Sequence, residues 1–331
     1  MHAFRIGIDS YCLQDLRPSA LEVLAWAEAH GAEGVQFSGG AVPAERAGDD
    51  GFLSELGAEA RARRMYVEWG GGQHLPFDTR TWRPRSIVPL CERAARQARA
   101  VGANVVRSCS GGLFRWTDEA PPTEELLAAM TRALPALRPV YEDLGVTLAI
   151  EVHFEFTTFE LRRMFEACGA EPGGYLGICL DTMNLLTMLE DPVEGTRRIL
   201  PWVVATHIKD GAVGLGASGL VSFPVEPGAG VVNLGAILDL LATLPRVPNL
   251  TLEDHGGSFE IPIFAPAFLR RFPDLTAGEL ARIVHLVQRN EDRPAAERAR
   301  PLPREDWPAA GEERVARGIA TLRRLAAGRD G

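Results

Sequence analysis

The chain has 331 residues, 46% of them hydrophobic and 24% charged, and its 35 Lys and Arg against 44 Asp and Glu give a net charge of −9. This length and composition are typical of a globular protein with a sizeable core. Because duplex-binding surfaces need concentrated positive charge, we expect no nucleic acid as a main partner. No apolar run approaches the roughly 20 residues that span a bilayer, so we expect no membrane segment.

The first residues and the cysteines favour a cytoplasmic location. Residues 1–5 run directly into a segment typical of a β-strand, which leaves no room for a signal peptide. The five cysteines form neither a Cys-x-x-Cys pair nor an even framework: Cys12, Cys91, Cys109, Cys168 and Cys179. We therefore expect reduced thiols in a cytoplasm.

Short β-rich runs alternate with long amphipathic runs along most of the chain. The predicted strands are Phe4–Ser10, Gly34–Phe37, Tyr66–Trp69, Asn104–Cys109, Thr147–His153, Leu176–Asp181, Val203–Lys209 and Asn249–His255. The predicted helices between them are Pro18–His30, Gly51–Arg64, Ser86–Val101, Thr123–Leu144, Thr158–Cys168, Glu190–Leu200 and Leu234–Leu244. Strands separated by helices of this length indicate parallel β-α-β units.

Eight such units between residues 4 and 255 match the roughly 250 residues of a (β/α)8 barrel. A doubly wound open sheet is the alternative, but it usually has a Gly-rich first turn, whereas residues 9–13 here read Asp-Ser-Tyr-Cys-Leu. We therefore predict an α/β fold, a (β/α)8 TIM barrel with a C-terminal helical extension.

Two regions depart from this alternation. Gly211–Gly230 is rich in glycine and proline and is predicted as a long loop after the seventh strand. The tail contains two further helical patterns, Thr276–Asn290 and Gly311–Ala327. The first could supply the eighth barrel helix. We therefore assign residues 1–290 to the barrel and 291–331 to an extension packed on the barrel or on a partner subunit.

The last four predicted strands each finish on a side chain that can bind a metal ion: Glu151, Asp181, His207 and Glu253. Small residues stand two positions before each, which is consistent with a crowded inward face. The C-terminal strand ends of a barrel meet at its mouth, where active sites form. Three carboxylates and one imidazole suit one Mn²⁺ or Mg²⁺ ion, with Co²⁺, Fe²⁺ or Zn²⁺ as substitutes. Burying these carboxylates without a cation would be costly.

The motifs around these residues resemble those of the xylose isomerase-like TIM barrels. They are Ile-Glu151-Val-His153, Cys-Leu-Asp181-Thr-Met-Asn184, Thr-His207-Ile-Lys209-Asp210 and Leu-Glu253-Asp254-His255. That superfamily includes sugar isomerases and epimerases, inosose dehydratases and type IV endonucleases, and the resemblance covers roughly residues 4–260. It implies that the four strand-end residues hold one divalent ion, commonly Mn²⁺. In the epimerases, the two glutamates also move protons on opposite faces of the substrate.

The chain departs from two branches of that superfamily. Ketose 3-epimerases carry a glutamate, a histidine and an arginine where this chain has Thr157, Asn184 and Val213. The three-metal endonucleases need several further histidines, and only seven exist here. The segments after His255 and around Arg304 are similar to those expected in catalytic subunits of bacterial C-glycoside deglycosidases, which cleave 3-keto-glycosides by elimination.

These patterns favour a metal-dependent sugar isomerase or epimerase that removes a proton next to a carbonyl through a metal-stabilised enediolate. One alternative is a metal-dependent lyase that eliminates from a keto-sugar or inosose. A noncatalytic sugar-binding protein is the other. We expect a small sugar or keto-sugar as substrate, and the second tail helix is compatible with a homo-oligomer or a small partner subunit.

The residues predicted to be catalytic are Glu151, Glu253, His153 and Lys209, of which the last two lie two positions after a ligand and would share its face. The predicted substrate-binding residues are Glu68, Arg107, Trp116, Asn184 and His255. The alternative for the basic residues is that they orient or neutralise the ligands. The alternative for Trp116 is that it fills a hydrophobic gap.

Overall fold

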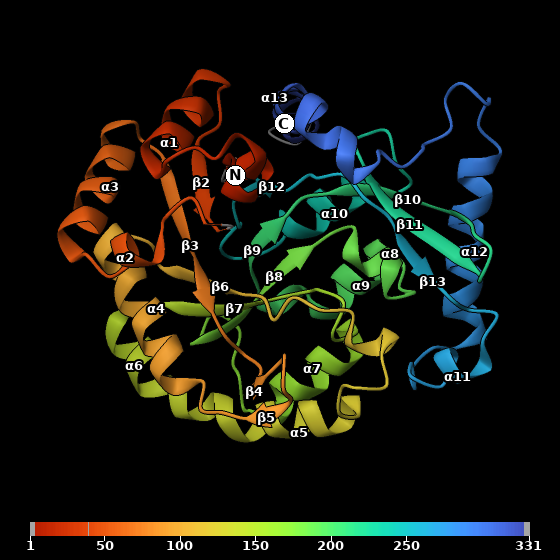
Figure 1. Ribbon diagram of the computed structural model, residues 1–331, viewed down its shortest axis with the longest axis horizontal. Coiled ribbons are helices and arrows are strands. Elements are labelled where there is room, and N and C mark those ends of the chain that lie inside the picture. The colour runs from red at the N-terminus through yellow and green to blue at the C-terminus, as the bar shows by residue number, and fades with distance from the viewer. Residues whose placement is uncertain (1–3, 39, 328–331) are drawn as a thin grey trace.

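The computed structural model describes residues 4–38 and 40–327 and has the predicted (β/α)8 architecture (Figure 1). The barrel strands are β1 (Ile6–Asp9), β2 (Gly34–Phe37), β3 (Tyr66–Gly72), β6 (Val105–Ser108), β7 (Thr147–Glu151), β8 (Leu176–Asp181), β9 (Val203–His207) and β12 (Leu250–Leu252). They are parallel and neighbour one another in chain order, with β12 beside β1. A bridge between Ile208 and Leu252 joins β9 to β12 and brings the two ends of the sheet together.

One face of the barrel strands carries small residues that pack together inside the ring. Val105, Ala149, Cys179 and Ala205 form a buried cluster that is separate from the main core between strands and helices. Two positions further along β7, β8 and β9, the same face carries the polar strand ends. In the register of β8 and β9, Asp181 lies opposite His207.

The helices around the barrel before the tail are α1 (Ala20–Ala29), α3 (Asp50–Ala62), α4 (Val88–Val101), α5 (Thr123–Ala133), α6 (Arg138–Leu144), α7 (Thr158–Ala167), α9 (Pro192–Ile199) and α10 (Leu234–Leu241), of which α5 and α6 together fill one predicted helix. Shorter elements are α2 (Ala44–Ala47), α8 (Asn184–Thr187), β4 (Phe77–Asp78) and β5 (Arg83–Pro84). A capping box of Ser19 and Glu22 begins α1. The helix predicted over Thr123–Leu144 contains a 3₁₀ turn at Leu134–Leu137, because Pro135 has no N–H to donate.

The segment Gly211–Gly230 is not the loop that its composition predicts. It contains two antiparallel strands, β10 (Asp210–Leu215) and β11 (Leu220–Val225), and β13 (Phe259–Ile261) adds a third strand. The glycines in this segment interrupt the alternation that is typical of strands, yet the backbone conformation beside β11 requires one of them. Gly219 has φ +153°, and a Cβ there would lie 2.5 Å from the carbonyl oxygen of Ile261.

The tail contributes α11 (Pro266–Leu269), α12 (Ala277–Glu291) and α13 (Trp307–Ala327). The expectation that the first long tail helix is the eighth barrel helix is wrong, because α12 packs against β10 (Figure 1). Instead α13 packs against β1 and β12, and it buries Val315, Ile319 and Leu322. No helix in the described ranges has the length and apolar character that a membrane crossing requires.

Candidate metal centre and active site

The four strand-end residues predicted as ligands lie together at one mouth of the barrel. Three of them end β7, β8 and β9, and Glu253 directly follows β12. One ligating atom from each of Glu151, Asp181, His207 and Glu253 lies within 4.8 Å of the others, and all four residues are buried. The barrel brings them together because parallel strands end at the same rim and β9 adjoins β12.

His207 connects this cluster to the opposite side of the barrel. Its Nδ1 lies 3.2 Å from Oε1 of Glu151 and 3.3 Å from Oε2 of Glu253. Its Nε2 lies 2.6 Å from Oε1 of Gln36 and 3.1 Å from Oδ2 of Asp9. A proton on Nε2, donated to the Gln36 carbonyl, leaves the Nδ1 lone pair directed at the two glutamates, as a metal ligand requires.

Gln36 is itself held in the orientation that suits His207. Its amide nitrogen donates to Oε2 of Glu68 at 2.8 Å, so its oxygen is free to accept from the imidazole. The other oxygen of Glu68 accepts from Asn249 Nδ2 at 3.0 Å. Glu68 therefore acts on the cluster through Gln36, from inside the barrel.

Two buried cations face the carboxylates. Lys209 Nζ lies 3.0 Å from Oδ2 of Asp181 and 2.5 Å from Oε2 of Glu253. The guanidinium of Arg107 forms an ion pair with Glu151. These two positive charges therefore contact all three carboxylates.

The pKa values of the three carboxyl groups differ because these charges offset burial unequally. Burial raises the pKa of Glu151, but Arg107 and His207 outweigh it and the net pKa lies below its ordinary value. Burial likewise raises the pKa of Glu253, and Lys209 and His207 lower it well below its usual range. The pKa of Asp181 is raised, because burial outweighs the effect of Lys209. Both glutamates are therefore ionised at neutral pH.

The donor set fits a hard divalent cation. Oδ1 of Asp181 accepts from the backbone N–H groups of Met183 and Asn184 at 2.9 and 2.8 Å, whereas its buried Oδ2 lies 3.0 Å from the Lys209 ammonium but accepts no well-directed hydrogen bond among the described residues. Two adjacent ligand atoms about 2.1 Å from one metal ion lie about 3.0 Å apart in octahedral geometry and about 3.4 Å apart in tetrahedral geometry. The separations from His207 Nδ1 to the two glutamate oxygens, 3.2 and 3.3 Å, are of that size. The buried cluster could therefore bind a divalent ion.

A cavity of about 470 Å³ opens onto the cluster, and both Glu151 and Glu253 line it. Its volume is within the range of small-molecule sites. The structure also brings five of the other predicted site residues to this cavity: Arg107, His153, Asn184, Lys209 and His255. The walls are thus rich in groups that can exchange hydrogen bonds with a polyhydroxylated ligand.

Two predicted substrate-binding residues lie elsewhere. Among the described residues, the lining of this cavity includes neither Glu68 nor Trp116. Glu68 is buried in the barrel interior with Gln36 and Asn249. The indole N–H of Trp116 donates to the carbonyl of Glu260 at 2.7 Å, and its ring meets that of Phe268 edge-on. Trp116 thus packs among tail residues.

Residues from both ends of the chain that were not among the predicted site residues also contribute to the cavity and to the cluster. The cavity lining also contains Tyr11, Cys109, Phe154, Phe259 and Arg304, and Asp9 and Gln36 hold His207. Asp9 ends β1, so the strand-end argument used for the other ligands could have found it. Arg304 lies in the tail segment noted above for its similarity to the deglycosidases, but no local pattern assigns this residue to the cavity, and only folding places it 3.4 Å from Tyr11.

Comparisons with known proteins agree with this architecture. Residues 24–271 match the xylose isomerase-like TIM barrel family. Over 154 residues the chain is 27% identical to the uncharacterized protein YihM of Escherichia coli (strain K12), and this match spans 45% of the chain and 44% of YihM. The chain thus matches less than half of the length of that relative.

Two solved structures share the fold along nearly their whole lengths. D-psicose 3-epimerase of Clostridium cellulolyticum H10, solved with D-tagatose, superposes with a TM-score of 0.62 at 13% identity, over 97% of this chain and 99% of that one. The 3-keto-D-glucoside 4-epimerase YcjR of E. coli superposes with a TM-score of 0.57 at 16% identity, over 85% and 99%. The match over residues 24–271, together with this shared fold, shows that the chain belongs to the xylose isomerase-like TIM barrel family.

Proposed function

We propose that this protein is a divalent-metal-dependent sugar isomerase or epimerase, with Mn²⁺ as the preferred ion. The observation that carries the proposal is the convergence of three carboxylates and one imidazole beside a sugar-sized cavity, which Glu151 and Glu253 line. The fold shared with two sugar epimerases supports the same class of substrate.

The two glutamates are suited to move a proton. Both line the cavity, and they come from strands β7 and β12, which β8 and β9 separate. Because both carboxyl groups are held ionised by neighbouring cations, either can accept a proton from the carbon next to a substrate carbonyl. If the other glutamate has taken a proton from solvent, it can deliver that proton to the opposite face of the same carbon, which gives an epimer. When bound, a divalent ion would stabilise the negative charge of the enediolate oxygen.

The remaining polar wall would bind and orient the substrate. The Lys209 ammonium, which already contacts Asp181 and Glu253, can donate to a substrate oxygen beside the metal ligands. Arg107 holds Glu151 and also lines the cavity, so it can position that carboxylate for proton transfer. His153, Asn184 and His255 supply further donors and acceptors for hydroxyl groups.

Elimination from a keto-sugar or a 3-keto-glycoside is the second candidate reaction. It begins with the same proton removal and differs only in expelling a group from the next carbon. The observation that favours it is the presence of Arg304 and Phe259, which lie beyond the last barrel strand, in the cavity wall. These residues could accommodate the leaving group of a larger substrate.

Product analysis with keto-sugars, inososes and 3-keto-glycosides, in the presence of Mn²⁺, tests both candidates. A product of unchanged mass supports isomerisation or epimerisation, and loss of water or of an aglycone supports elimination. The matched control is Glu253→Gln loaded with the same amount of metal. Tight sugar binding without turnover on any of these substrates would overturn the proposed enzyme activity and favour a sugar-binding protein.

A further inference from the structure

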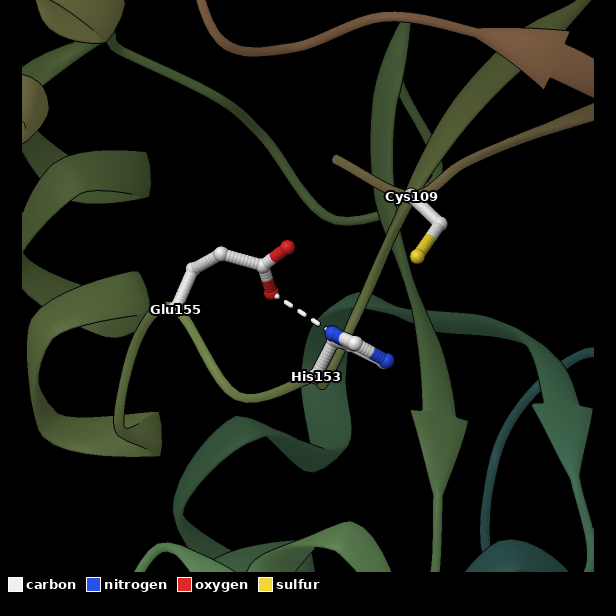
Figure 2. Close-up of side chains that lie close together, drawn as sticks. All are labelled: Cys109, His153 and Glu155. Carbon is white, nitrogen blue, oxygen red and sulfur yellow. Dashed lines mark hydrogen bonds and ion pairs between the residues drawn. The ribbon is translucent and has the colours of Figure 1, made fainter. Parts of the chain in front are cut away.

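A second group of potential metal ligands lies beside the first, and the proposed function does not treat this group as a metal site. Cys109 follows β6, whereas His153 and Glu155 follow β7, the strand that ends at Glu151. One ligating atom of each of the three lies within 4.8 Å of the others. Figure 2 shows the three side chains turned toward one another, with an ion pair joining His153 and Glu155.

Only one of the two carboxylate oxygens of Glu155 has a hydrogen-bond partner within the described part of the chain. Its Oε2 lies 3.1 Å from Nδ1 of His153, but its Oε1 is buried and, within the described part of the chain, makes no hydrogen bond. The residue is 2% exposed, so bulk water does not readily supply the missing hydrogen bond to this oxygen. A buried carboxylate oxygen of this kind indicates an absent partner.

The three donors match the preferences of a particular ion. A thiolate, an imidazole and a carboxylate suit Zn²⁺, which in catalytic sites commonly has three protein ligands and one open position. The 3.1 Å separation of His153 Nδ1 and Glu155 Oε2 is close to the roughly 3.4 Å between two ligand atoms on one tetrahedral ion. The first cluster has no sulfur donor, so the two sites differ in chemistry.

We propose that Cys109, His153 and Glu155 form a second metal site, which takes Zn²⁺. Cys109 and His153 line the cavity and Glu155 lies buried beside them, so the open coordination position faces the cavity. A water molecule or a substrate hydroxyl would complete the coordination there. This site shares His153 with the cavity wall of the proposed reaction, whereas Cys109 and Glu155 have no part in that reaction.

Titration with Co²⁺ separates the two sites, because only a cysteine ligand gives a thiolate-to-cobalt charge-transfer band in the near ultraviolet. We expect wild type to bind two Co²⁺ ions per chain and to show this band. Cys109→Ser should bind one ion without the band, and Asp181→Asn, altered in the first site, should keep the band. Wild type that shows no such band at saturating Co²⁺ would overturn the proposal, whatever the activity of the enzyme.

Thiol alkylation provides a second measurement that does not depend on a variant folding. All five cysteines lie in the described ranges, and Cys109 is the only one that is not buried. Iodoacetamide should therefore modify Cys109 first, and Zn²⁺ should slow this reaction at least tenfold. Glu155→Gln should reduce the protection by removing one ligand charge. Alkylation of Cys109 at the same rate with and without Zn²⁺ would also overturn the second site.

Discussion

The ammonium nitrogen of Lys209 lies 2.5 Å from a carboxylate oxygen of Glu253, so the chain itself places a cation on a proposed metal ligand. The same nitrogen lies 3.0 Å from Asp181. Burial lowers the pKa of Lys209, but Asp181 and Glu253 outweigh it and raise the pKa well above its ordinary value. A divalent ion and this ammonium therefore compete for the same oxygens. Lys209 is also the only lysine in the chain, which makes it unusually easy to observe.

Lys209→Met should bind Mn²⁺ more tightly than wild type, because two ligand carboxylates lose their resident cation. We expect the metal-free variant to melt at a lower temperature than wild type. Adding metal should raise the melting temperature of the variant more than that of wild type, as calorimetry would show. In wild type labelled with ¹³C-lysine, one side-chain signal should appear and should shift on adding Mg²⁺. An unchanged signal at saturating Mg²⁺ would mean that the ion binds elsewhere.

Asp181→Ala and His207→Ala should each lose most of the metal held at the first site, since each removes a direct ligand. Metal analysis of protein purified without chelator measures this loss. Asp118→Ala is the matched control, because the side chain of Asp118 is 95% exposed and forms its ion pair with Arg271, outside the metal cluster. Full occupancy in both ligand variants would rule out the proposed first site.

Glu151→Gln and Glu253→Gln test the proton transfer. Each keeps the shape of the side chain but removes its ability to accept a proton, so the variant of the base should lose roughly 10²–10⁴-fold in kcat while still binding substrate. Rates must be compared at saturating Mn²⁺ with measured occupancy, because both residues are also proposed ligands. Glu166→Gln, on the exposed face of α7, is the control. Near-normal turnover in both metal-loaded variants would remove the acid and base roles.

Arg314→Leu should destabilise the protein, and more strongly as the pH rises. Arg314 of α13 forms two hydrogen bonds with Asp254, at 2.6 and 2.8 Å, next to Glu253. Burial raises the pKa of Asp254 to about 6 even though Arg314 opposes it. In the unfolded chain the pKa of Asp254 is about 4, so between about pH 4 and 6 this carboxyl group is protonated in the folded state and ionised in the unfolded state. The stability that this bound proton supplies to the folded state is therefore lost as the pH rises from about 4 to 6.

Without Arg314, the pKa of Asp254 rises further and the loss extends to higher pH. Removing one partner of a buried ion pair costs about 3–5 kcal/mol when the remaining charge must ionise. We therefore expect the largest difference from wild type near pH 8 and a smaller one near pH 5, measured by chemical denaturation. The double variant Arg314→Leu/Asp254→Asn should lose this pH dependence. If the variant lost the same free energy of unfolding at both pH values, the ionisation of Asp254 could not be the cause.

The alternation of strands and helices was sufficient to predict the barrel, because hydrophobic periodicity is a local property of the chain. It failed between residues 211 and 230, because β10 contains two glycines, β11 contains Pro224, and the third strand of the sheet, β13, follows much later in the chain. It also failed for the eighth helix. Two tail segments have suitable apolar stripes, and only the tertiary packing selects α13 over α12.

The site could be predicted in part for the same reason. Glu151, Asp181, His207 and Glu253 follow one rule, since each stands at the end of a strand in a ring whose order follows the chain. Gln36 and Glu68 could not be recognised by that rule. Their role depends on the distance across the barrel to His207, which no local pattern encodes. The position of Trp116 was likewise decided by tail residues that pack against it.

The packing of α13 against β1 has a consequence for synthesis on the ribosome. The first barrel strand emerges early, whereas the helix that packs against it and β12 is among the last described segments to be translated. Until then, Leu252 of β12 lacks the close contact of Gly318, where a Cβ would lie only 2.8 Å away. The junction of β1 and β12 therefore stays without its covering helix until α13 has been translated.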